Sequence, residues 1–170
     1  MECRIPAEVL PGVPDAMLRR MRPDILLFER SACDSLPLIA NDLQHAQHRQ
    51  RCRVHVVEVG FCTEVAYPQK YKEKNEQHAL LLEHLKKAGY ADVQLHLLII
   101  GSTGGMFRLT ALHLARLGVT HQKVGDVLQD LHWKALHRLE QITGTRRRLE
   151  HEDSKGSQDR RKAGKRKRGT

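Results

Sequence analysis

The stretch at residues 53–74, RVHVVEVGFCTEVAYPQKYKEK, decides the fold because it joins a valine-rich segment to the beginning of a helix. The valines at residues 54–59 are almost uninterrupted, which is typical of a strand that is covered on both faces. Glu58 lies within this run, and an ionised carboxylate in such a position is costly unless a cation pairs with it. We therefore expect a metal ion or a lysine beside Glu58.

A second acid occupies a similar position upstream, in the segment at residues 22–28, RPDILLF. A proline can start a strand but does not fit inside a central one, so we expect Asp24 at the mouth of a short strand. A third strand is predicted at residues 93–100, VQLHLLII, the most apolar segment of the chain. Two acids at strand ends with a nearby amine form a site for a divalent cation and an activated water.

The segment at residues 69–88 has the pattern of a helix that a glycine ends. Its apolar face contains Leu81, Leu82, Leu85 and Ala88. Extended backwards by threes and fours, this face meets Lys74, Gln77 and His78. Lys74 is therefore placed to approach acids at the strand ends, whereas Lys72 lies more nearly toward water. The alternative is that Lys74 only extends past the helix end into solvent.

The glycine-rich run at residues 101–105, GSTGG, separates the third strand from a helix predicted at residues 106–117. Such a turn can bind phosphate, but it lacks the Walker and dinucleotide patterns, so a tight connection is the simpler interpretation. The apolar residues of 124–142 recur at helical spacing. We expect Gly144 to end both this helix and the folded region.

The remaining segments give weaker signals. Residues 1–20 contain three prolines and little periodicity, and we interpret them as a leader. Residues 35–53 fit either a short strand or a surface helix. Within them, His45 and His48 have a spacing that can bind a metal on a helix, but without an HExxH frame we expect an exposed polar face.

Composition bounds the class of protein. The four cysteines show no C-x-x-C pairing, which argues against a zinc ribbon or a disulfide framework. No apolar run reaches the roughly 18 residues that span a bilayer, and the beginning of the chain lacks the order of a secretory signal. These features predict a soluble, intracellular protein with no membrane partner.

The positive charge is concentrated at one end of the chain. Residues 146–170 carry 11 Lys and Arg against 4 Asp and Glu, a net +7 of the +9 for the whole chain. This tail lacks an apolar pattern and is predicted to be disordered. It can bind nucleic acid nonspecifically, serve as a nuclear address, or be a solvated tail without a partner. The candidate nucleic-acid-binding residues are Lys70, Arg146, Arg147, Arg148, Lys165, Arg166, Lys167 and Arg168.

The order of the predicted elements describes a small α/β domain with a mixed sheet. In the runs RPDIL, VHVVEVGFC, KYKEKxxQHxxL and LIIGSTGG, the chain resembles the restriction-endonuclease-like domain of some non-LTR retrotransposon polyproteins, a branch of the PD-(D/E)XK nuclease superfamily. The resemblance covers about residues 22–119. It implies a restriction-endonuclease-like domain at residues 21–145, a small mixed β-sheet flanked by helices, with a C-terminal amphipathic helix before the basic tail.

The resemblance also implies the chemistry. Asp24 and Glu58 would bind Mg²⁺ or Mn²⁺, and a lysine would help to polarise the water that attacks a DNA phosphate. The simplest superfamily pattern, E-x-K, would place this lysine at Gly60. Retrotransposon members are similar to this chain in having moved the lysine to the following helix, which makes Lys74 the first candidate. The weaker catalytic candidates are Lys70, Lys72 and Gln77.

Three functions from different classes follow. The first is a metal-dependent DNA endonuclease of retrotransposon type, as an isolated module or as part of a larger polyprotein. The second is a catalytically inactive nucleic-acid-binding remnant, which the glycine at position 60 favours. The third is an interaction domain without chemistry, whose acids are satisfied by Arg22 or Arg53.

Overall fold

Three strands form one mixed sheet in a computed structural model of the protein. The structure describes the backbone of residues 3–30 and 40–166 and the side chains of residues 3–30 and 42–147. The strands are β1 (Ile25–Arg30), β2 (Cys52–Cys62) and β3 (Asp92–Gly101). Strand β2 lies in the middle, antiparallel to β1 and parallel to β3. The prediction that these three segments share a small mixed sheet is confirmed.

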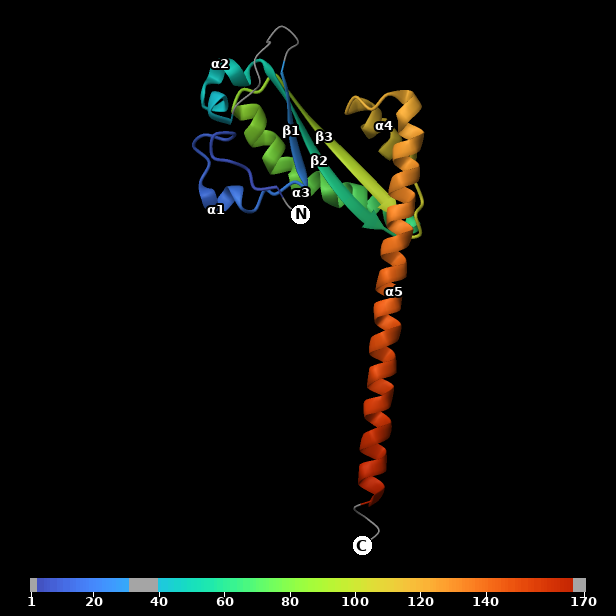
Figure 1. The fold of residues 1–170 in the computed structure, drawn as a ribbon. Helices are drawn as coiled ribbons and strands as arrows, with labels where there is room; N and C mark the ends of the chain where they lie inside the picture. Colours follow the sequence, from blue (N-terminus) through green and yellow to red (C-terminus); the bar gives the residue numbers. More distant parts are fainter. Residues whose placement is uncertain (1–2, 31–39, 167–170) are drawn as a thin grey trace.

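Helices cover both faces of this sheet. They are α1 (Asp15–Leu18), α2 (Ala46–Arg49), α3 (Tyr67–Lys87), α4 (Arg108–Arg116) and α5 (His121–Arg166), with short 3-10 turns η1 (Ala40–Gln44) and η2 (Glu64–Ala66). Figure 1 shows α3 crossing behind the strands, whereas α4 and the first part of α5 lie beside β3. The residues predicted as an ambiguous segment before β2 thus contain two short helical turns, η1 and α2.

Alternation along β2 divides its side chains between two cores. Val54 and Val56 point toward α3, where Leu81 and Leu85 are fully buried against them. Val57 points to the other face and packs with residues of β3, α4 and α5. Because successive side chains of a strand alternate between the faces, Glu58 faces α3, the same side as Val54 and Val56.

The segment predicted as a leader is part of the first core. Ile5, Val9 and Leu10 are each at most 2% exposed. The hydroxyl of Tyr90 donates a hydrogen bond of 2.8 Å to the carbonyl oxygen of Val9. This irregular segment therefore packs into the core on the α3 face of the sheet, and the expected separation of residues 1–20 from the domain is wrong.

The glycine-rich turn after β3 holds a carboxylate from the protein itself. Thr103 donates a hydrogen bond to Glu64 Oε1. A Cβ atom at Gly101 would lie 2.3 Å from the same oxygen, so a side chain there would displace Glu64, and Gly104 has a φ of +86°, which favours glycine. His132 Nδ1 lies 2.6 Å from the carbonyl oxygen of Gly104, which fixes α5 to the turn. The turn is a tight connection, and Glu64 occupies the position that a bound phosphate would need.

The last helix is longer than the sequence predicted. Helix α5 does not end at Gly144 but continues to Arg166 and projects from the body of the protein (Figure 1). Residues 145–166 contain no proline and many strong helix formers. A single helical glycine costs only about 1 kcal/mol, so Gly144 does not stop the helix. The prediction of a disordered tail is wrong for the backbone up to Arg166.

Candidate functional site

Glu58 and Lys74 form an ion pair between the sheet and α3. The Glu58 side chain is buried, and its Oε1 atom accepts a hydrogen bond from the Lys74 ammonium group. Lys74 also donates a hydrogen bond of 3.0 Å to Gln77 Oε1. The Lys74 side chain is only 16% exposed, so it does not extend into solvent. Helical spacing thus correctly predicted that Lys74 approaches the acid of β2.

Asp24 lies directly before β1, next to the same part of β2. Its Oδ2 atom accepts a hydrogen bond of 2.8 Å from the backbone N–H of Val59. The last pair of the register is Ile25 with Val57, and Asp24 comes directly before Ile25. Val59, which contacts Asp24, is the residue after Glu58 on β2. The structure therefore brings the two predicted acids to the same end of β1.

His78 is a third side chain at Glu58, to which the sequence analysis gave no role. It lies one turn after Lys74 on α3, and its Nε2 atom is 3.0 Å from Glu58 Oε2. This is an ion-pair distance, and both atoms are buried. Burial lowers the pKa of His78, and the Glu58 carboxylate partly opposes this shift. The helix spacing placed His78 on this face, but only the folded structure shows its contact with Glu58.

Asp24 and Glu58 are the two carboxylates here that could bind a divalent cation. Among residues 3–30 and 42–147, no three His, Cys, Asp or Glu side chains are grouped to hold a metal ion. Mg²⁺ is usually bound by only one or two carboxylates, with water and substrate phosphates as its other ligands. Both oxygens of Glu58 already have neighbours, Lys74 at Oε1 and His78 at Oε2. A cation at Glu58 would therefore have to compete with these two side chains.

The weaker lysine candidates lie away from the two acids. Lys70 Nζ is 3.7 Å from Glu73, and Lys72 Nζ is 3.9 Å from Glu76. The Lys72 side chain is 78% exposed, as expected from its position on the helix. Gly60, where the E-x-K pattern has lysine, lies on β2. The amine at Glu58 therefore comes from α3.

The predicted nucleic-acid-binding residues on α5 are only partly described. Arg146 and Arg147 are exposed. The side chains of Arg148, Lys165 and Arg166, and the whole of Lys167 and Arg168, lie outside the described residues. The structure does not bring Arg146 or Arg147 to the acids of β1 and β2, because they lie on the projecting part of α5 (Figure 1).

The structure also shows the contacts of the His45–His48 pair and of Arg53, for which the sequence suggested roles. His45 and His48 have ring centroids 6.1 Å apart, and His48 Nδ1 lies 3.2 Å from a guanidinium nitrogen of Arg30. Arg53, a candidate partner for the acids, instead contacts Glu29 at 3.1 Å and Asp92 at 3.0 Å. Arg53 therefore does not neutralise Asp24 or Glu58.

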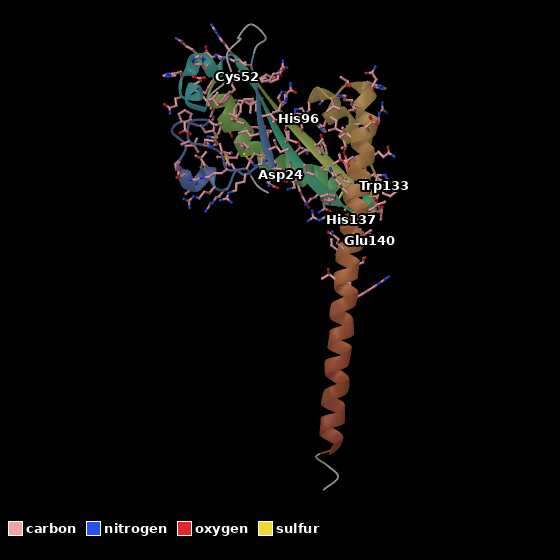
Figure 2. The ribbon with its side chains drawn as sticks, in the orientation of Figure 1. Asp24, Cys52, His96, Trp133, His137 and Glu140 are labelled. Atoms are coloured by element: carbon pink, nitrogen blue, oxygen red, sulfur yellow. The ribbon has the colours of Figure 1, made fainter. Side chains whose placement is uncertain are left out.

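A separate histidine cluster lies on the opposite face of the sheet. His55, His96 and His113 are each at most 6% exposed, and His96 lies between the strands and α4 (Figure 2). His55 Nδ1 is 2.9 Å from His96 Nε2, and the rings of His96 and His113 are perpendicular. Burial and neighbouring cationic groups lower the pKa of His96 to about 4. The sequence shows histidines inside two strands, but their meeting depends on the register between β2 and β3.

Comparison with known proteins places the chain in no family. No family model, curated protein or solved structure matches this sequence. Within the described parts of the chain, no helix is both long and apolar enough to cross a membrane. The function has to be inferred from the geometry around Glu58.

Proposed function

We propose that this protein is a metal-dependent DNA endonuclease with a restriction-endonuclease-like fold. The observation that supports this function best is the position of Lys74, whose amine contacts the buried carboxylate of Glu58 while Asp24 contacts the next residue of β2, Val59. Two acids that hold a divalent cation and an amine that orients water can together promote phosphodiester hydrolysis. The sequence resemblance assigns these roles to the same residues.

Asp24 and Glu58 would hold Mg²⁺ or Mn²⁺. The bound cation supplies positive charge for the phosphate oxygens and makes water a better nucleophile. Lys74 orients the attacking water by a hydrogen bond and balances the charge of Glu58. Gln77 keeps the Lys74 amine in place through its side-chain oxygen, 3.0 Å away.

His78 restricts the position of the Glu58 carboxylate. Its Nε2 atom approaches Oε2 from α3 while Lys74 contacts Oε1. Because burial lowers the pKa of His78, the ring is neutral at pH 7. A neutral ring leaves the negative charge of Glu58 available to a cation.

The partner we propose is DNA, and the chain would act as a module of a retroelement polyprotein or as a fragment of one. Residues 146–170 carry a net charge of +7, which favours attraction to the phosphate backbone. The basic run that includes Lys165 and Arg166 would direct the protein to the nucleus.

A second candidate function is DNA binding without cleavage. It is favoured by the ion pair itself, because Lys74 already neutralises Glu58, so a cation would have to compete with the amine. In this case the site would be a structural remnant, and the two acids would serve only to fix β1 and α3 to β2.

A nicking assay on supercoiled plasmid, with Mg²⁺ or Mn²⁺ and with chelator, separates the two functions. We expect Asp24→Asn and Glu58→Gln to abolish nicking while DNA binding is kept or tightened, because carboxylate–phosphate repulsion falls. Lys74→Ala should slow nicking by about 10²- to 10⁴-fold. Lys72→Ala is the matched control, since Lys72 lies on the same helix but pairs with Glu76, and it should retain activity.

The outcome that contradicts the nuclease is equally specific. If the folded, unsubstituted protein binds DNA but shows no metal-dependent nicking that Asp24→Asn removes, the remnant function is correct. The absence of a lysine at Gly60 would then be the first cause to test, by Gly60→Lys in the presence of Lys74.

A further inference from the structure

A groove lined by residues of β1 and β2 includes Asp24 and has no role in the proposed chemistry. Its volume is about 790 Å³, within the usual range for a ligand site of about 300–1,000 Å³. Ile25, Val59 and Phe61 line it together with Cys3 and Leu26, and Asp24 and Arg138 of α5 complete the lining. The groove therefore links a proposed metal ligand to an aromatic ring and a cation.

Phe61 presents part of its ring to this groove. It follows Glu58 by three residues on β2, so its side chain lies on the opposite face from Glu58. The side chain is 41% exposed, and Arg138 Cζ lies 5.3 Å from the ring centroid. A cation–π contact at an exposed site is worth only about 0.5–1 kcal/mol. A ligand that offers a better partner to each group can therefore separate them.

The neighbouring surface is more apolar than a phosphate-binding surface should be. Ile25 and Leu27 of β1 point to the same face as Phe61, and each is 45% exposed. Exposed apolar side chains that adjoin a groove mark a binding surface. Phosphates gain nothing from such side chains, whereas an unpaired base can stack on a ring and contact aliphatic groups.

We propose that this groove binds single-stranded or locally unpaired DNA, with one base stacked on Phe61 and Arg138 paired with an adjacent phosphate. Binding of unpaired DNA does not depend on the proposed nuclease function. Only the place where the bound strand would be cleaved rests on that function, because Asp24 lines the groove. Bases in an intact duplex are already stacked on each other and cannot reach Phe61. Nucleic acid is favoured over an apolar peptide because Arg138 lies on α5, which carries the exposed Arg146 and Arg147 further along.

The test measures binding of the full chain to two fluorescent DNA probes in the presence of chelator, by anisotropy. One probe is a single strand and the other is a blunt-ended duplex of the same strand with its complement, which has no unpaired bases. Phe61→Leu should weaken binding to the single strand by roughly tenfold or more and leave duplex binding unchanged. Phe61→Tyr keeps the ring and should bind both probes like the unsubstituted protein.

Arg138 and a second exposed ring supply the controls. Arg138→Gln should weaken single-strand binding and reduce its salt slope by about one. Trp133 is 61% exposed on α5 but does not line the groove, so Trp133→Leu should not change the preference (Figure 2). Equal binding of both probes, or equal losses in Phe61→Leu and Trp133→Leu, would overturn the assignment. So would binding of an apolar peptide that Phe61→Leu abolishes while single-strand binding persists.

Chelator keeps this test independent of cleavage. If Phe61-dependent binding is found but no nicking occurs with either Mg²⁺ or Mn²⁺, the nuclease function is rejected and the groove is supported. If nicking occurs but Phe61→Leu binds the single strand normally, the nuclease stands and the groove assignment is overturned.

Discussion

The two faces of the sheet both bury polar side chains, but different contacts offset the free energy of removing these side chains from water on each face. On the α3 face, Glu58 is paired with Lys74 and approached by His78. On the opposite face, His55 contacts His96, and His96 packs edge-on against His113. The first cluster depends on an ion pair, whereas the second depends on contacts between imidazole rings and on Glu29, whose Oε2 atom lies 3.3 Å from His55 Nε2.

Burial does not distinguish the two clusters. Glu58 and His78 are 6% and 1% exposed, and His55 and His96 are likewise 6% and 1% exposed. The clusters differ in charge and in neighbours: the Glu58 cluster contains an ion pair and lies beside Asp24, whereas the histidine cluster is covered by α4. Because burying a charge is costly unless it is paired, Glu58 depends on the amine of Lys74.

The largest effect on folding is expected from breaking the ion pair. Glu58→Gln removes the charge and leaves Lys74, 16% exposed, without its partner, which should destabilise the protein by about 3–5 kcal/mol. The double variant Glu58→Gln/Lys74→Met should lose less than the two single variants together. Urea unfolding of the four proteins at neutral pH measures the coupling.

Glu76→Gln is the surface control, because Glu76 pairs with the exposed Lys72. It should change the free energy of unfolding by no more than about 0.5 kcal/mol. A loss of the same size in Glu58→Gln would show that the buried pair contributes nothing and would remove the contrast between the two faces.

The next effect is a pH dependence of the free energy of unfolding, which arises from the buried His96. The pKa of His96 is about 4 in the folded protein and 6.5 in the reference state, so the unfolded chain binds its proton first as the pH falls. The stabilisation is present above pH 6.5 and is lost between pH 6.5 and about 4. At about 1.36 kcal/mol per pKa unit, the loss is about 3 kcal/mol.

Unfolding curves across this pH range, for the unsubstituted protein and for His96→Leu, measure the effect. His96→Leu should flatten the slope, whereas His45→Leu, on the surface turn at η1 and α2, should keep it. An unchanged slope in His96→Leu would mean that the pH dependence comes from elsewhere, with His78 on the α3 face as the next group to replace, since burial also lowers its pKa.

The smallest effect concerns a neutral hydrogen bond that attaches α4 to the sheet. Thr110 is fully buried, and its hydroxyl donates a hydrogen bond of 2.7 Å to the carbonyl oxygen of Ile99. Thr110→Val keeps the shape but removes the donor, and should cost about 1 kcal/mol. Thermal unfolding of this variant, with Thr110→Ser as the control that keeps the hydroxyl, measures the effect. A loss in Thr110→Ser equal to that in Thr110→Val would assign it to the methyl group instead.

The sequence by itself determined the three strands, α3 and the direction of Lys74. These features follow from local periods of two or 3.6 residues, which fix the face that a side chain occupies whatever the rest of the chain does. The same reasoning failed for residues 1–20 and for the end of α5. Burial of Ile5 and Val9 depends on how they pack against β2 and α3, and Gly144 ends a helix only when the following residues disfavour it.

The tertiary structure decided what each side chain meets. Asp24 reaches Val59 because β1 runs antiparallel to β2, and His78 reaches Glu58 because α3 packs on that face. The histidine cluster and the contact of Arg138 with Phe61 likewise join distant parts of the chain. No local period encodes such contacts, since they depend on strand register and on how the helices pack against the sheet.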